Sequence, residues 1–128
     1  MSKLRLQLKD LSKIAVLADD LTGSCDTAAQ FCSYGLTTAV TSDITVSYDF
    51  PVEVIVVNTA TRSVPEEKAR SIVSLTLKRL KYLNRKIFYK KIDSTAKGNW
   101  VAEIREIMKI MQPDIVIVAP AFPTWGRT

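Results

Sequence analysis

One pattern constrains the fold more than any other: an apolar run ends abruptly in charged residues, and a helical pattern follows. Residues Ile14–Ala18 are apolar at every position, which is typical of a strand buried on both faces of a parallel sheet. The run leads directly into Asp19 and Asp20. A predicted helix follows, closed by Gly35 as a left-handed cap, with an apolar stripe made of Cys25, Ala28, Ala29 and Cys32. This stretch therefore predicts a unit of strand, polar turn and helix.

The same unit recurs along the chain. Further strands are predicted at residues 37–40, 52–57, 87–92 and 114–119, and further helices at about 63–83 and 99–111. Because strands alternate with helices, we expect a mainly parallel sheet of about five strands in a three-layer α/β/α, Rossmann-like fold. Only a short loop follows the last predicted strand, so we expect the fold to be incomplete at its C-terminus. Residues 1–13 are predicted to be an N-terminal arm, and residues 14–128 one partial α/β domain.

The spacing of apolar residues also predicts which faces of the later helices are buried. The first of these helices should bury Ala69, Ile72, Val73, Thr76, Leu80 and Leu83. The second should bury Val101, Ile104, Ile107, Met108 and Met111.

Composition narrows the class of protein. A chain of 128 residues that is 47% hydrophobic can bury a core without staples. The net charge of +5 comes from basic residues spread over several segments, whereas nucleic-acid binders usually concentrate theirs, so this charge is compatible with nucleic acid but fits an anionic metabolite equally well. Cys25 and Cys32 would lie about 10 Å apart on one helix, too far for a disulfide. With no apolar stretch of membrane-spanning length, we expect a cytoplasmic protein with reduced thiols and no membrane partner.

Polar residues follow several of the predicted strands at the point where each strand ends. Because the carboxyl ends of parallel strands share one edge of the sheet, the turns beginning at Asp19, Asn58, Asp93 and Pro120 should lie close together. Cationic side chains there suit a carboxylate or phosphate, and carboxylates and amides suit hydroxyl groups. The pattern therefore predicts a site for a small hydroxylated acid. Its candidate ligand-binding residues are Asp19, Asp20, Arg62, Lys91, Asp93, Ser94, Thr95, Asn99 and Arg127.

Structural roles are open alternatives for several of these residues. Asp19 or Asp20 could cap the first helix, and Arg62 could be an ordinary surface arginine. The turn at 93–99 could equally be a capped helix start. The first turn has neither a Gly-x-Gly-x-x-Gly pattern nor a Walker lysine, which excludes a dinucleotide fingerprint and a P-loop there. With no histidine and no Cys-x-x-Cys, a transition-metal site is not expected, although paired aspartates could help to hold magnesium.

Three motifs in this order resemble the four-carbon acid sugar kinase family. They are Ala18-Asp19-Asp20-Leu21-Thr22-Gly23, then Lys90-Lys91-Ile92-Asp93-Ser94-Thr95 continuing to Gly98-Asn99, and Ala119-Pro120-Ala121-Phe122-Pro123 leading to Gly126-Arg127-Thr128. Members of that family join an N-terminal sugar-binding domain to a C-terminal nucleotide-binding domain. The resemblance spans residues 14–128 and corresponds only to the first part of the family's length. Where the family usually has Leu-Arg, this chain has Ala96-Lys97, which keeps the charge but loses bidentate geometry.

The resemblance implies ATP-dependent phosphorylation of a hydroxyl group on a four-carbon sugar acid such as threonate or erythronate. ATP and Mg²⁺ are the cofactors it implies, and without a nucleotide-binding domain this chain is expected to hold neither tightly. Arg62, Lys91 and Arg127 would hold the substrate carboxylate or neutralise the transferred phosphoryl group. Asp20 or Asp93 would orient or deprotonate the attacking hydroxyl group, and the choice between them is open.

The remaining candidates take supporting roles in the same hypothesis. Asp19 would pair with a lysine or magnesium, and the other hydroxyl groups of the substrate would be read by Ser94, Thr95 and Asn99. The expected partners are the sugar acid, a nucleotide-binding domain in another chain, and a second copy joined at an open sheet edge. The alternative hypothesis is a non-catalytic binding module or sensor for a small hydroxy-acid anion.

Overall fold

A computed structural model describes residues 14–45, 52–81, 85 and 87–127 of the chain. The N-terminal arm predicted for residues 1–13 lies outside the described residues. Within those ranges no helix combines the length and the apolar character that a membrane crossing requires.

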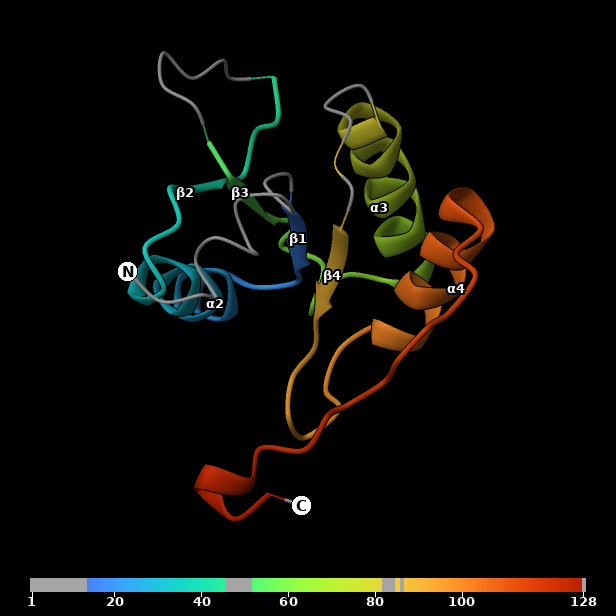
Figure 1. The fold of residues 1–128 in the computed structure, drawn as a ribbon. Coiled ribbons are helices and arrows are strands. Elements are labelled where there is room, and N and C mark those ends of the chain that lie inside the picture. The colour runs from blue at the N-terminus through green and yellow to red at the C-terminus, as the bar shows by residue number, and fades with distance from the viewer. Residues whose placement is uncertain (1–13, 46–51, 82–84, 86, 128) are drawn as a thin grey trace.

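Four parallel strands form the centre of the fold (Figure 1). They are β1 (Ile14–Ala18), β2 (Thr38–Thr41), β3 (Val54–Asn58) and β4 (Ile87–Lys91), in the order β2-β3-β1-β4. Ala18 at the end of β1 lies opposite Asn58 on β3 and opposite Lys91 on β4. Because these three strands end at the same level, the polar turns that follow them begin side by side.

Three helices cover the two faces of the sheet, which confirms the predicted α/β/α layering. Helix α2 (Leu21–Ser33) packs on one face, and α3 (Glu66–Lys81) and α4 (Trp100–Met111) pack on the other (Figure 1). Alternate strand residues face the two layers, as the pleat requires. Ala15, Leu17, Ile55 and Val57 join α3 and α4 in one core cluster, and Ile14, Val16, Val54 and Val56 join α2 in the other.

The fifth strand predicted at residues 114–119 is wrong. This segment pairs with no strand in the described part of the chain, and its apolar side chains face solvent, with Ile115 78% and Ile117 85% exposed. Figure 1 shows it leaving α4 and running past the β4–α4 turn to a short 3₁₀ helix, η1 (Pro123–Trp125). A β-prone run becomes a strand only where a neighbouring edge accepts its backbone hydrogen bonds, and local sequence does not supply that edge.

The buried face of α2 differs from the predicted stripe. Ala28 is buried as expected, but Cys25 and Cys32 are exposed free thiols. The face toward the sheet instead carries Gly23, which has no side chain, and Ser24, whose side chain is small, so the helix can approach closely. The predicted cap at Gly35 is confirmed: its φ is 81°, and its N–H donates to the Cys32 carbonyl at 2.8 Å.

The faces of the other two helices were predicted with unequal success. Helix α3 buries Ala69, Val73 and Leu80 as expected, while Leu83 lies outside the described residues. Helix α4 buries Glu103 and Ile107, whereas Val101 and Met108 are exposed at 42% and 45%. The buried face of α4 therefore includes the Glu103 carboxylate, which a prediction from hydrophobic spacing leaves out.

Candidate functional site

The polar turns lie at the point in the sheet where the connecting helices change from one face to the other. Strands β1 and β3 are neighbours, yet the helix after β1 covers one face and the helix after β3 covers the other. Open α/β sheets bind ligands in the crevice that such a switch leaves at the carboxyl ends of the strands. The turns that begin at Asp19 and Asn58 border this crevice, and the turn after Lys91 lies beside it.

Arg62 is the centre of the polar cluster in this crevice. Its Nη2 donates to Asp19 Oδ1 at 3.0 Å and its Nε to Asp19 Oδ2 at 3.3 Å, a bidentate pair. Its Nη1 lies 2.9 Å from Asp20 Oδ2. The Arg62 side chain is 30% exposed and that of Asp19 only 1%. The Arg62 guanidinium thus joins two carboxylates. Its partner Asp19 is buried, while Arg62 itself is partly open to solvent.

The cluster fixes the charge of Arg62. Its hydrogen bonds to Asp19, with the charges of Asp19, Asp20 and Asp93, raise the pKa of the guanidinium despite its partial burial. Arg62 therefore stays cationic at every working pH.

Asp20 has a structural role as well as a place in the cluster. Its Oδ1 accepts a hydrogen bond from the Gly23 N–H at 3.0 Å, so it is the N-cap of α2. Together with the pairs to Arg62, this means that all four carboxylate oxygens of Asp19 and Asp20 face an N–H donor. The capping alternative is thus the observed contact for Asp20, and it holds the same carboxylate beside Arg62.

Gly98 allows the turn after β4 to pack against this cluster. Its φ is 86°, and a Cβ at this position would lie 2.8 Å from Asp19 Oδ2 and 3.3 Å from Arg62 Cγ. Glycine is the residue that fits both the left-handed backbone and the close approach. The glycine of the Gly-Asn motif is therefore explained by packing against the Asp19–Arg62 pair.

Asp93 closes a turn at the end of β4. Its Oδ2 accepts hydrogen bonds from the Thr95 hydroxyl group and from the Thr95 N–H at 2.9 Å. These bonds are the main reason that the pKa of Asp93 lies below its usual range, and the charge of Arg62 lowers it further. Asp93 thus lies within the electrostatic reach of the cluster as an ionised acceptor.

The hydrogen bonds of Lys91, Arg127 and Asn99 show how the other predicted residues are held. Lys91 Nζ donates to the Ile92 carbonyl at 2.7 Å, and Arg127 Nη1 donates to Ser94 Oγ. Asn99 is turned inward: its Nδ2 donates to the carbonyls of Thr61 at 2.9 Å and Val64 at 2.7 Å. Asn99 therefore ties the start of α4 to the turn that carries Arg62.

A buried chain of polar side chains lies beneath the cluster, and hydrophobic spacing does not predict it. Lys90 Nζ lies 2.7 Å from Glu103 Oε2, with the two side chains 7% and 0% exposed. Thr61 Oγ1 donates to Glu103 Oε1, and Thr59 Oγ1 lies 2.8 Å from Thr61 Oγ1. Thr59 in turn donates to the Ala18 carbonyl at 3.0 Å. The available signal was a carboxylate one position from the predicted buried stripe of α4.

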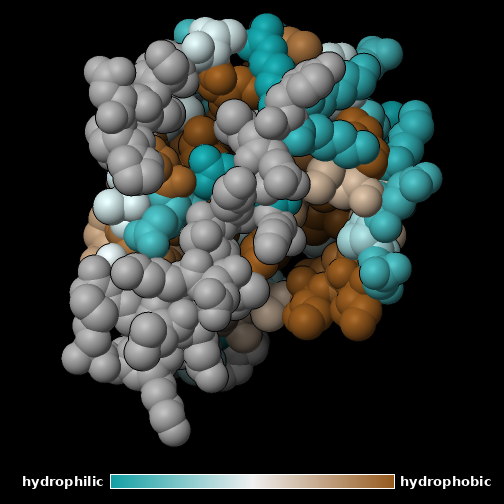
Figure 2. Space-filling model, turned by 45° about the horizontal axis from the view of Figure 1, so that its top comes forward, coloured by the Kyte–Doolittle hydropathy of each residue, from teal (hydrophilic) through white to brown (hydrophobic). Residues whose placement is uncertain are grey.

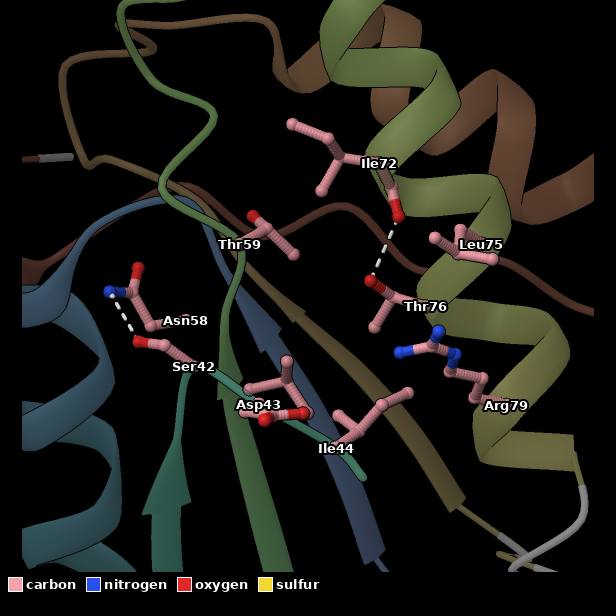
Figure 3. A pocket seen from close by; sticks show the side chains of 10 residues that line it. Ser42, Asp43, Ile44, Asn58, Thr59, Ile72, Leu75, Thr76 and Arg79 are labelled. Carbon is pink, nitrogen blue, oxygen red and sulfur yellow. Dashed lines mark hydrogen bonds between the residues drawn. The ribbon is translucent and has the colours of Figure 1, made fainter. Parts of the chain in front are cut away.

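Asn58, predicted to belong with the other polar turns, instead lines a cavity next to α3, and its carboxamide points toward Ser42 (Figure 3). Its Nδ2 donates to Ser42 Oγ at 3.3 Å, and its Oδ1 accepts from the Ala60 N–H at 3.0 Å. The cavity, of about 190 Å³, lies between the ends of β2 and β3 and helix α3. Arg79 and Asp43 are its charged lining residues. Arg79 therefore lines this cavity, whereas Arg62 does not.

The donor chemistry of the cluster does not fit a resident metal ion. Among the described residues no group of three or more histidine, cysteine, aspartate or glutamate side chains is placed to hold one. The carboxylates of Asp19 and Asp20 are also already turned toward N–H donors. The predicted use of an aspartate pair for magnesium therefore finds no support in this geometry.

Comparison with known proteins identifies the family. A family model described as "Sugar-binding N-terminal domain" matches residues 14–128, so the chain belongs to this family of sugar-binding domains. The chain is 37% identical over 117 residues to D-threonate kinase of Salmonella typhimurium, covering 91% of this chain and 28% of that protein. It is 30% identical over 124 residues to 3-oxo-tetronate kinase of the same organism, covering 91% of this chain and 29% of that one. The chain thus spans under a third of the length of these relatives.

A solved structure agrees with the fold. A protein of Bordetella bronchiseptica, crystallised with bound citrate as a domain-swapped dimer, superposes with a TM-score of 0.82 at 34% identity. The match covers 89% of this chain and 30% of that one. A second crystal form of the same protein gives a TM-score of 0.77.

Proposed function

We propose that this chain is the substrate-binding part of an ATP-dependent kinase that phosphorylates a four-carbon sugar acid such as threonate or erythronate. The family match supports the sugar-binding role, and the kinases among the relatives support the substrate class. The observation that carries the proposal is Arg62, whose partly exposed guanidinium is oriented by two carboxylates at the switch point of the sheet. There the Arg62 guanidinium would pair with the anionic group of a small hydroxy acid, and the aspartate oxygens beside it would accept hydrogen bonds from its hydroxyl groups.

In this proposal the residues that touch the sugar acid carry cations, hydroxyl groups or a carboxylate. Arg62, Lys91 and Arg127 receive the carboxylate or the transferred phosphoryl group, because each carries a positive charge that an anion would pair with. Ser94 and Thr95 bind hydroxyl groups, and either Asp20 or Asp93 orients or deprotonates the attacking one. Asp19 and Asn99 act from below, since Asp19 is buried against Arg62 and Asn99 holds the turn that carries it.

The kinase relatives support use of ATP and Mg²⁺ by the family. Because the described cluster does not fit a metal, the proposal places both in a nucleotide-binding domain, supplied further along a longer chain or by another chain. This chain's own residues would hold the sugar acid and exclude water from the reacting hydroxyl group.

Calorimetry on the purified chain tests the binding claim. We expect D-threonate or D-erythronate to bind, while butyrate, which lacks the hydroxyl groups, and erythritol, which lacks the carboxylate, do not. Arg62→Lys keeps the charge but loses the fork, so affinity should fall about tenfold. Arg79→Lys, in the neighbouring cavity, is the matched control and should bind normally. A folded sample that binds none of the sugar acids would contradict the proposal.

A binding module or sensor without catalysis is the competing function, and the brief length relative to the kinases favours testing it directly. Adding ATP and a separately expressed nucleotide-binding domain from a relative separates the two. A kinase part yields ADP only when sugar acid is present, whereas a sensor yields none.

We also propose a second copy of the chain as a partner, joined through residues 114–119. In the described ranges β4 pairs only with β1 and leaves one edge open, and the apolar segment 114–119 is exposed. Figure 2 shows hydrophobic residues on the surface both gathered in a patch and scattered singly. The domain-swapped Bordetella protein is a precedent.

Light scattering on wild-type protein and Ile117→Lys tests this partner. We expect a dimer for the wild type and a monomer for Ile117→Lys. Leu75→Lys, at an exposed position on α3, should stay dimeric. A wild-type monomer at the highest soluble concentration would contradict the proposal.

A further inference from the structure

The ion pair between Lys90 and Glu103 lies in the interior, where charges are costly. The two side chains are 7% and 0% exposed, and Nζ lies 2.7 Å from Oε2, close but not aligned as a hydrogen bond. Removing two charges from water opposes folding, and apolar side chains of similar size often serve stability equally well. Its neighbours, Leu17 on β1 and Ile107 on α4, are apolar. Core packing alone therefore does not account for this pair.

The pair is connected to the turn at residues 59–65, which we call the Arg62 turn. Thr61 Oγ1 donates to Glu103 Oε1, and Thr59 Oγ1, which lies 2.8 Å from Thr61 Oγ1, donates to the Ala18 carbonyl at 3.0 Å. This chain of contacts runs from α4 to the end of β1. It reaches the residue directly before Arg62.

The Arg62 turn needs such support, because its backbone is not one that the sequence prefers. Ala60, between the two threonines, has a φ of 51°, in the left-handed region that residues with a Cβ rarely adopt. Two side chains hold the turn on either side of Arg62: Glu103 of α4 through the Thr61 hydroxyl group, and Asn99, directly before α4, through the Thr61 and Val64 carbonyls. With the turn in place, the Arg62 N–H donates to the Asp19 carbonyl at 3.2 Å.

We propose that Glu103, held by Lys90, is a positioning residue for the binding site: through Thr61 it fixes the turn that aims Arg62 at the ligand. It touches no ligand itself. Its effect on affinity rests on the proposed function, whereas its effect on the Arg62 turn does not.

Variants that separate stability from position test this proposal. Glu103→Leu alone strands a buried ammonium, and Lys90→Met alone strands a buried carboxylate, so both should unfold at lower urea concentration. The double variant Lys90→Met/Glu103→Leu removes both charges and should recover most of the wild-type midpoint. It still lacks the acceptor for Thr61, so the Arg62 turn should remain loosened.

Amide hydrogen exchange by NMR reads the turn directly. In the double variant we expect exchange at the Thr59 and Arg62 amides to speed up about tenfold, and sugar-acid affinity to fall by a similar factor. Ile107→Val, a buried change on the same helix, should lower the urea midpoint slightly without selective loss of protection at Arg62. Wild-type exchange and wild-type affinity in the double variant would overturn the proposal.

A second pair of variants keeps the test sharp if the double variant fails to fold. Thr61→Val removes the hydroxyl group that donates to Glu103, and Thr61→Ser keeps it. Exchange at Arg62 should rise in the first and stay near wild type in the second, and equal exchange in both would refute the role of Glu103. If the wild type binds no sugar acid, the proposed function fails, while the exchange result still decides the positioning role.

Discussion

The Arg62 turn and the segment of residues 113–127 both carry predicted site residues but are held very differently. The Arg62 turn is tied to β1 and α4 by side-chain and backbone hydrogen bonds from Thr59, Thr61, Arg62 and Asn99. Among the described residues, the C-terminal segment is joined to the rest by one hydrogen bond, from Arg127 to Ser94. Yet the turn is polar, and the segment is rich in Ile and Val. Hydrophobicity alone therefore does not decide which segment becomes buried, because burial also needs neighbouring elements to pack against.

The largest expected effect is the loss of Arg62. Arg62→Met leaves the Asp19 carboxylate buried without its counter-ion, so the free energy of unfolding should fall by about 3 kcal/mol. Urea unfolding followed by circular dichroism measures this. Arg79→Met, at an exposed position on α3, should cost less than about 0.5 kcal/mol. Equal losses for the two arginines would break the distinction between a fixed turn and an ordinary surface.

Two apolar substitutions sharpen the comparison from the other side. Val57 on β3 is 1% exposed and Ile117 is 85% exposed, although both lie in β-prone runs. We expect Val57→Ala to cost about 2 kcal/mol, and Ile117→Ala less than about 0.5 kcal/mol in dilute, monomeric samples. A large loss for Ile117→Ala under those conditions would mean that the segment packs on its own domain.

Two glycines in left-handed conformations make a matched pair. Gly98 has a φ of 86° and would press a Cβ against Asp19, whereas Gly126 has a φ of 68° with nothing within 4 Å of the added atom. Gly98→Ala should cost about 1–2 kcal/mol and weaken sugar-acid binding. Gly126→Ala should cost less than about 0.5 kcal/mol, since its segment has little to lose. Thermal unfolding of both variants tests this, and a harmless Gly98→Ala would contradict the close packing of the two turns.

The smallest effect concerns the titration of Asp93. Its pKa is lowered in the folded protein, so its contribution to stability is present above the unfolded value of 3.8 and is lost as the pH falls through the lower, folded value. NMR titration of the carboxyl carbon should give a lower midpoint in the wild type than in Thr95→Val. Arg62→Lys should keep it low, because the charge remains. An unchanged midpoint in Thr95→Val would show that the Thr95 bonds do not hold Asp93.

Local pattern was sufficient to predict most of the fold. The first strand and the turns at Asp19 and Asp93 follow from short-range features, and so does the cap at Gly35. The predicted strand at 114–119 failed because pairing depends on a distant edge. The predicted stripe of α2 failed because small polar residues, such as Ser24, can face a sheet that lies very close.

The candidate site was only partly predictable. Parallel strand ends placed Asp20, Arg62 and Asp93 in one region, as expected from topology. The pairing of Arg62 with both aspartates depends on three turns whose distances the sequence does not encode locally. Glu103 was missed because hydrophobic spacing treats a carboxylate as solvent-facing, whereas here its counter-charge, Lys90, comes from another element. Which of the predicted site residues touch a ligand stays a prediction.

The central claim is that the turns after β1, β3 and β4 form one site for a small hydroxylated acid. The most direct test is a titration of isotope-labelled protein with D-threonate, followed by amide chemical shifts. We predict saturable shifts that begin together at Asp20, Arg62 and Thr95. Shifts centred instead on Asp43 and Arg79, or none at saturating ligand, would contradict the account.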